Sequence, residues 1–175
     1  GTTFTVTRVS FVGGYPCDKI TSVKLPETVT HLDVGVFSGA SLESITISKS
    51  VQYIEENANT QLKKVPKYNV ALDNPYFKSD NDGALYSKDG KTLRFVPSSI
   101  PLDNGTYTVN SDVEKITKSC FTLIDGLKKI NLPPNLQEVS VGYPSIAPID
   151  VLEEFAITPG GSTPYSIKDG VLCKG

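Results

Sequence analysis

Few side chains in this 175-residue sequence combine a type and a spacing that suit catalysis. His31 is the only histidine, and it lies between Thr30 and Leu32. A catalytic histidine needs a nucleophile and an orienting carboxylate that converge on it. The sequence contains no Gly-x-Ser-x-Gly or comparable nucleophile motif. We therefore expect His31 to be a surface or turn residue, and we expect the protein not to be an enzyme.

The three cysteines, Cys17, Cys120 and Cys173, do not indicate a zinc site or a redox pair, because no two stand in Cys-x-x-Cys spacing. Cys120 lies between Ser119 and Phe121, in a position that the repeats described below assign to a small buried side chain. Free cysteine packs as a small hydrophobic residue, so we predict Cys120 to be part of the core. A disulfide between Cys17 and Cys173, near the two chain ends, is not expected in an elongated fold.

A cluster of acidic residues offers a candidate calcium loop. Asp80, Asp82 and Gly83 stand at the spacing of such a loop, in which the sixth residue is glycine. If Gly83 is that glycine, the first ligand position falls on Lys78 and the twelfth on Asp89 instead of glutamate. Hairpin turns explain the same residues better, and we predict no metal site and no cofactor.

Paired glutamates also fail as an acid–base couple. Glu55-Glu56 and Glu153-Glu154 are adjacent in sequence, so in a strand the two carboxylates of each pair point to opposite faces.

The overall charge of the chain is nearly balanced. The sequence has 17 Lys and Arg and 19 Asp and Glu, for a net charge of −2. Without a basic surface, and without an apolar run of about 20 residues, we expect no nucleic-acid partner and no membrane insertion in this segment.

The elements that position these residues are internal repeats. Segments that begin at Ile20, Leu42 and Leu127 share the spacing Leu-x-x-Ile-x-Leu, and each has further apolar residues nine and twelve places after its start. The first two start 22 residues apart, within the period of roughly 20–29 residues that is typical of leucine-rich repeats. Weaker copies begin at Leu62 and Leu152.

The repeat pattern predicts short strands that stack. Alternation places Ile45 and Ile47 inward and Thr46 outward. One such unit cannot close its own core, but stacked units bury each other's apolar edges. The predicted fold is therefore a right-handed leucine-rich repeat solenoid, mainly β with short irregular or helical turns. We expect Val23, Ile45 and Ile130 to lie in one shared row.

A different element interrupts the repeats. Residues 74–106 read as strands joined by Asp82-Gly83 and Asp89-Gly90, the dipeptides that type I′ hairpin turns favour. The sequence thus divides into an unplaced N-terminal strand segment (1–19), repeats (20–73), an inserted β-hairpin meander (74–106), repeats (107–162) and the start of a second, truncated meander (163–175).

The repeats and the meander resemble the BspA-like leucine-rich repeat surface proteins. The resemblance rests on the repeat spacing, on Phe37 and Phe121 eight residues after a valine, and on Asp-Gly-Ala-Leu-Tyr-Ser-Lys-Asp-Gly at 82–90. It covers roughly residues 20–66 and 74–175. It implies a secreted or surface-exposed bacterial protein, hence an extracellular or cell-surface location. Several members of this family adhere to host proteins or to other cells.

Two positions depart from the family pattern, because Asn59 and Pro144 occupy the aromatic position in other copies. The candidate binding surface is the ladder of outward strand positions on the concave sheet, where solenoids commonly bind partners. This ladder is polar, small and mixed in charge, so binding and simple solvation are both open. Its residues are Ser22, Lys24, Ser44, Thr46, Lys64, Lys129, Asn131 and Glu154.

Two functions fit these observations. The first is a non-enzymatic, extracellular leucine-rich repeat module for contact or adhesion at a bacterial cell surface, whose partner is a host or neighbouring-cell surface protein or glycan. The alternative is a structural spacer in a larger surface protein, with no ligand of its own. A concave-face substitution such as Lys129→Glu separates the two, because it weakens a ligand only under the first.

Overall fold

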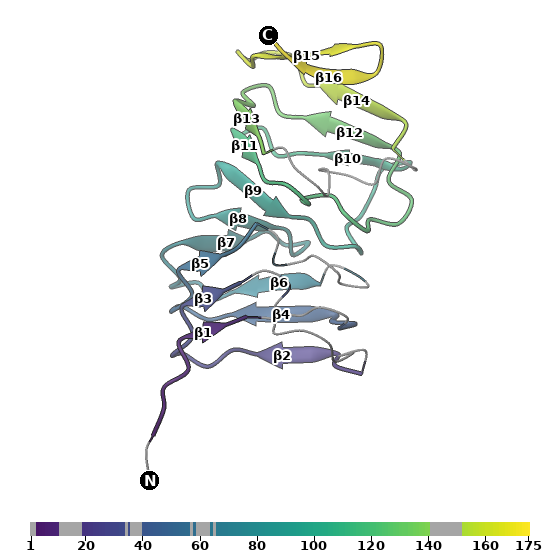
Figure 1. The fold of residues 1–175 in the computed structure, drawn as a ribbon. Coiled ribbons are helices and arrows are strands. Elements are labelled where there is room, and N and C mark those ends of the chain that lie inside the picture. Colours follow the sequence, from purple (N-terminus) through teal and green to yellow (C-terminus); the bar gives the residue numbers. More distant parts are fainter. Residues whose placement is uncertain are drawn as a thin grey trace.

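The computed structural model describes residues 3–10, 19–33, 35, 40–56, 58, 64, 66–140 and 152–175. They form a β-solenoid of about 5 turns, an elongated stack with the two chain ends at opposite ends (Figure 1). The described residues contain no helix. The predicted leucine-rich repeat solenoid is therefore confirmed, with irregular segments joining its strands.

One side of the stack carries two parallel three-stranded sheets, which together we call the ladder face (Figure 1). The first consists of β2 (Ser22–Lys24), β4 (Ser44–Ile47) and β6 (Lys67–Val70). The second consists of β10 (Thr106–Thr108), β12 (Lys129–Leu132) and β14 (Glu154–Ile157).

The opposite side carries a three-stranded and a five-stranded sheet, which we call the opposite face (Figure 1). The first is made of β1 (Arg8–Val9), β3 (His31–Leu32) and β5 (Tyr53–Ile54). The second is made of β7 (Phe77–Ser79), β8 (Leu85–Ser87), β9 (Thr92–Phe95), β11 (Lys115–Ile116) and β13 (Glu138–Val139). A hairpin of β15 (Tyr165–Lys168) and β16 (Val171–Lys174) follows β14.

The strand registers produce the inward rows that the repeats predict. Val23, Ile45 and Tyr68 are directly paired across β2, β4 and β6. Ile130 pairs with Tyr107 in the corresponding row of the second ladder-face sheet. The expected row is thus present within each sheet, but Ile130 lies in a separate sheet from Val23 and Ile45, because β6 and β10 are not paired.

The meander strands contribute to two hydrophobic cores. Leu85 and Phe95 pack with the first repeats, in what we call the N-terminal core. Tyr86 and Leu93 pack with the later repeats, in the C-terminal core. Leu85 pairs with Phe95 and Tyr86 with Leu93 across β8 and β9, so alternation along the same two strands serves both cores. The predicted burial of Cys120 is confirmed, since its side chain is 0% exposed in the C-terminal core.

The meander hairpins form, but their turns differ from the predicted type I′. That type needs positive φ at both central residues, whereas only Gly83 (+85°) and Gly90 (+83°) have it and Asp82 and Asp89 do not. The Gly83 N–H instead closes a four-residue turn on the Asp80 carbonyl at 3.2 Å. The Asp80 carboxylate also accepts the Asp82 N–H at 3.1 Å, which stabilises this turn.

Paired positive φ angles occur at two other places. Asn104 (+49°) and Gly105 (+79°) have them before β10, and Asp169 and Gly170 have them between β15 and β16. The first pair is held by mutual backbone hydrogen bonds between Asp103 and Thr106, at 3.0 and 2.8 Å. These two turns are the ones in which asparagine or aspartate followed by glycine adopts the I′ pattern.

Within the segment that sequence reasoning left unplaced, β1 pairs in parallel with β3. The boundaries assigned to the repeats and meanders remain predictions. Several residues singled out in the sequence lie outside the described residues, namely Cys17, Phe37, Asn59, Leu62 and Pro144.

Candidate binding surfaces

The first half of the predicted ladder lies on the ladder face. Ser22 of β2 is paired with Ser44 of β4, and Lys24 is paired with Thr46. Ser22, Lys24 and Thr46 are exposed and Ser44 is half-buried. These four side chains therefore form two outward rows across neighbouring coils, as the alternation predicts.

The assignment of Lys64 to the same ladder is wrong. In β6 the residue paired with Ser44 is Lys67, and the residue paired with Thr46 is Asn69. Lys64 lies before β6 and outside its strand. Sequence reasoning started this copy at Leu62 because it expected isoleucine or valine inside, whereas the buried position is taken by Tyr68, which is 3% exposed.

The second half of the ladder includes two residues that sequence reasoning missed. Thr106 and Thr108 of β10 are paired with Lys129 and Asn131 of β12. The alternation of threonine around Tyr107 was the available signal, but no leucine-rich copy begins there to reveal it. Lys129 contacts Glu154 of β14 at 2.7 Å, and the Asn131 amide donates to the Thr108 hydroxyl at 3.1 Å.

The charges on this part of the ladder face compensate one another. Besides Lys129 and Glu154, Lys128 lies 3.4 Å from Glu153. All four side chains are at least one third exposed, so each pair contributes little to stability. The surface is therefore an alternating, hydrogen-bonding strip, without a large patch of one sign.

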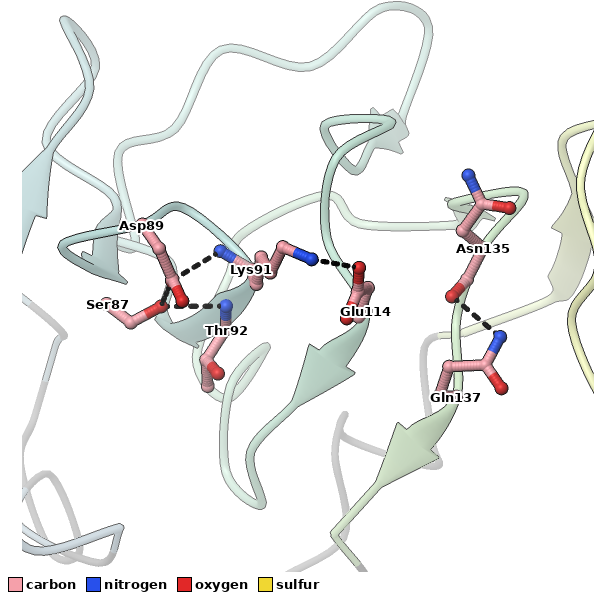
Figure 2. Close-up of polar contacts among 7 residues, drawn as sticks. All are labelled: Ser87, Asp89, Lys91, Thr92, Glu114, Asn135 and Gln137. Atoms are coloured by element: carbon pink, nitrogen blue, oxygen red, sulfur yellow. Dashed lines mark hydrogen bonds and ion pairs between the residues drawn. The ribbon is translucent and has the colours of Figure 1, made fainter.

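The opposite face carries a hydrogen-bond network that starts in the meander (Figure 2). The Ser87 hydroxyl donates to the Asp89 carboxylate at 2.6 Å and accepts from the Thr92 N–H at 2.9 Å. Asp89 also accepts the Lys91 N–H at 2.9 Å, and the Lys91 ammonium donates to Glu114 at 2.6 Å. The hydrogen bond from the Ser87 hydroxyl, and after it that from the Lys91 N–H, lowers the pKa of Asp89. The network fixes the turn and joins it to the next coil.

Similar contacts continue one coil further along this face. Lys115 lies 2.7 Å from Glu138. The Gln137 side-chain amide donates to the Asn135 carbonyl at 3.1 Å, a contact drawn in Figure 2, and to the Ser162 carbonyl at 3.0 Å. Both faces of the later coils are thus linked by polar contacts between neighbouring turns.

A cavity of about 390 Å³ lies between the meander and β10. Its floor contains two tyrosines, Tyr86 and Tyr107, that are only 6% and 7% exposed. The Tyr86 hydroxyl donates to the Asp80 carboxylate at 3.1 Å. Burial raises the pKa of both phenols, so both stay neutral.

Polar groups from two turns complete the cavity lining. Asp80 and Asp82 come from the first meander turn, and Asp103 comes from the turn before β10. Among the described residues, no three His, Cys, Asp or Glu side chains gather closely enough to hold a metal ion. Asp80 and Asp82, the acidic residues of the candidate calcium loop, lie in a hairpin turn and line the cavity.

The remaining candidates for chemistry have structural surroundings. Burial raises the pKa of the Cys120 thiol well above its ordinary value, which disfavours a reactive thiolate. The His31 ring nitrogen Nδ1 lies 2.8 Å from the Thr30 hydroxyl, and its ring centroid is 5.7 Å from that of Tyr53. Glu55 accepts the Tyr53 hydroxyl at 2.6 Å. In the part of the chain that the structure describes, no helix has the length and apolar character to span a bilayer.

Comparison with known proteins identifies the repeats. The BspA type leucine rich repeat region matches residues 7–80 and 103–143, in six copies. A solved leucine-rich repeat protein from Eubacterium ventriosum is similar, with 17% sequence identity and a TM-score of 0.61 over 82% of this chain and 43% of that chain. No curated protein matches the chain.

Two further solved structures resemble the chain. One is the pneumococcal vaccine antigen PcpA, with 21% identity and a TM-score of 0.58 over 79% of this chain and 39% of that chain. The other is a leucine rich cell surface protein from Faecalibacterium prausnitzii, with 22% identity and a TM-score of 0.57 over 78% of this chain and 39% of that chain. The chain thus spans about two fifths of the length of these solved proteins.

Proposed function

Because the chain belongs to the BspA-type leucine-rich repeat family, we propose that it is a non-enzymatic, extracellular module that contacts a protein or a glycan at a bacterial cell surface. The surface location is supported by a similar solved protein that is itself described as a leucine rich cell surface protein. The family and the fold agree with the resemblance drawn from the repeats. The partner would be a host or neighbouring-cell surface protein or glycan.

The observation that carries this proposal is the ladder face. Stacked parallel strands present rows of exposed polar side chains across neighbouring coils, which is the kind of extended surface that solenoids use for binding. Lys24 and Thr46 represent the first sheet, and Lys129 and Glu154 the second. A partner with its own alternating charges and hydrogen-bonding groups would match this strip.

A structural spacer is the second candidate, and one observation favours it. Lys129 and Glu154 neutralise each other, and Asn131 is hydrogen-bonded to Thr108. A strip whose polar groups are paired internally has less to offer a partner than one with free groups. The spacer role predicts that altering this strip changes neither adhesion nor stability, provided that the internal pairs are kept.

A pair of charge reversals separates the two functions. Lys129→Glu with Glu154→Lys keeps the ion pair but reverses its direction on the ladder face. The matched control is Lys115→Glu with Glu138→Lys on the opposite face, where the ions lie at the same 2.7 Å and are similarly exposed, at 34% and 53% against 33% and 56%.

The measurement is the retention of each labelled variant on host epithelial cells and on co-resident bacteria. For the binding role, we expect the ladder-face reversal to lower retention about tenfold, the factor for 1.4 kcal/mol, and the control to retain the native value. Equal retention of the native chain and both variants would support the spacer instead.

A further inference from the structure

We propose that the cavity between the meander and β10 binds a cationic side chain of a partner protein, the ammonium of lysine or the guanidinium of arginine. This site shares Thr106 and Thr108 of β10 with the ladder face, but its charges come from the two turns and not from the ion-paired strip. The proposal goes beyond the proposed surface role and does not depend on it, because it concerns what the purified chain binds.

The charge of the lining points to a cation. Asp80, Asp82 and Asp103 bring three carboxylates to the cavity from two different turns. No lysine, arginine or histidine is among the residues that line it. Asp82 is exposed, and no described side chain forms a salt bridge with any of the three carboxylates. The lining therefore has a net negative charge, and none of the described ion pairs includes its carboxylates.

The direction of the hydrogen bonds in the floor points the same way. The Tyr86 hydroxyl uses its only proton on Asp80, so its oxygen can only accept a hydrogen bond from a ligand. Together with the carboxylate oxygens it offers lone pairs, and a ligand that meets them must bring several donors, as ammonium and guanidinium groups do.

Few groups in the lining can donate. The hydroxyls of Tyr107, Thr106 and Thr108 and the Asn110 amide are the only lining side chains with protons to give, and Thr108 already accepts a bond from Asn131. An anionic ligand would find three carboxylates and no cation. A sugar usually stacks on an aromatic face, but Tyr86 and Tyr107 are 6% and 7% exposed and leave no face open.

The cavity also has the size and rigidity that this ligand needs. Its volume of about 390 Å³ lies in the range of small-molecule sites, so a whole side chain fits and not only its charged end. Ile100 and Pro101 provide an apolar wall for the aliphatic stem. The Asp80 carboxylate is fixed by two backbone N–H groups and the Tyr86 hydroxyl. A fixed carboxylate costs little ordering entropy on binding.

The test uses the purified full chain and matched small probes. Nα-acetyl-arginine amide and Nα-acetyl-lysine amide carry the proposed group, and Nα-acetyl-citrulline amide is a neutral analogue of the first with nearly the same shape. Binding is followed by NMR titration of the isotope-labelled chain at low ionic strength. We expect both cations to shift the resonances of Thr106 and Tyr107, and citrulline to bind at least tenfold more weakly.

Two substitutions remove charge without changing the turns. In Asp82→Asn with Asp103→Asn, asparagine suits both turn positions as well as aspartate does, and we expect affinity for the arginine probe to fall at least tenfold. Asp169→Asn removes one charge from the β15–β16 turn, outside the cavity, and should leave affinity unchanged. Thr106→Val provides a second variant, which leaves every carboxylate in place and should also weaken binding.

Several results would overturn the proposal. Equal binding of citrulline and arginine probes would remove the role of the charge. Unchanged affinity in the folded double variant would place the cation elsewhere. Tighter binding of free spermidine than of a tri-arginine peptide would assign the cavity to a soluble polyamine instead of a protein side chain. The cell-retention experiment tests the surface role and the titration tests the cavity. Each proposal can therefore be rejected without affecting the other.

Discussion

Asn74 is a buried side chain whose amide and carbonyl are both fully hydrogen-bonded inside the solenoid. It is 0% exposed, and its amide donates to the carbonyls of Ser48 and Val51 at 2.8 and 3.0 Å. Its carbonyl accepts the N–H groups of Tyr76 and Phe77, both at 2.8 Å. One asparagine thus replaces missing backbone partners at the point where the chain leaves the repeats and enters the meander.

We expect Asn74→Ala to lower the free energy of unfolding by about 3 kcal/mol or more, because several buried backbone groups lose their partner at once. Urea denaturation followed by far-UV circular dichroism measures the change. Asn69→Ala is the control, since Asn69 is exposed on β6, and it should change stability by less than about 0.5 kcal/mol. Similar losses in both variants would show that the four hydrogen bonds of Asn74 are not what stabilises this junction.

Asp89 makes stability depend on pH. Its pKa in the folded chain is lowered, chiefly by the hydrogen bond from Ser87 and then by that from the Lys91 N–H. A carboxyl group whose folded pKa lies below its unfolded value adds stability above about pH 4, and this contribution disappears as the pH falls through the folded value. Asp89→Asn should therefore be less stable than the native chain at pH 7 and equal to it near pH 2. Urea midpoints at the two pH values measure this, and a difference that persists at low pH would contradict it.

Single residues differ in how well sequence predicts them. Cys120 was assigned to the core from its repeat position, and it is 0% exposed. Asn74 gave no such signal, because its four partners come from residues up to 26 positions away and are visible only in the fold. The turn type at Asp82-Gly83 was missed for a related reason, since the side chain of Asp80 stabilises a different turn from the one that the dipeptide alone favours.

At the scale of elements, the first meander turn is attached directly to β6. The Tyr68 N–H donates to the Gly83 carbonyl at 3.0 Å. A Cβ on Gly83 would lie 2.8 Å from the Lys67 Cβ, closer than such atoms can approach, and the glycine also has φ of +85°. The contact exists because residue 83 has no side chain.

We expect Gly83→Ala to destabilise the chain by about 2–3 kcal/mol, from positive φ and the close contact together. Gly126→Ala is the matched control: Gly126 has φ of +75°, but a Cβ there meets nothing within 4 Å, so only about 1 kcal/mol of backbone strain is added. Thermal denaturation of both variants gives the comparison. Equal losses would mean that the packing of the turn on β6 contributes nothing measurable.

The elements themselves were predictable wherever the apolar alternation is regular. β4 and β12 lie where Ile-x-Ile and Ile-x-Leu place them. The strand predicted from Leu62 lies before the observed β6, because Tyr68 occupies the inward position where isoleucine was expected. The coil from β4 to β6 is also one residue longer than the coil from β2 to β4. The cavity beside β10 could not be predicted at all, since Asp82 and Asp103 meet only after the meander has folded onto the repeats.

At the scale of the whole molecule, the meander joins two stacks of coils. Leu85 of β8 and Phe95 of β9 pack in the N-terminal core. Tyr86 of β8 and Leu93 of β9 pack in the C-terminal core. The ring of Phe95 also stacks on Tyr68 of β6, with centroids 5.9 Å apart. A solenoid of identical repeats is coupled only through nearest neighbours, but here one pair of strands belongs to both cores.

Shared strands should make the two stacks unfold together. Phe95→Ala creates a cavity in the N-terminal core and Leu93→Ala one in the C-terminal core; both side chains are 0% exposed, and each change should cost about 3–5 kcal/mol. Hydrogen exchange in rising urea, read by mass spectrometry on peptides from β4 and β12, reports the two stacks separately. Both cores include side chains of β8 and β9, and these two strands are paired with each other. If one core unfolds, β8 separates from β9 and the other core loses its support. We therefore expect either variant to lower the urea midpoints of the β4 and β12 peptides by the same amount. A variant that exposes only the peptide of its own core would show instead that the meander is a hinge between two independently folding stacks.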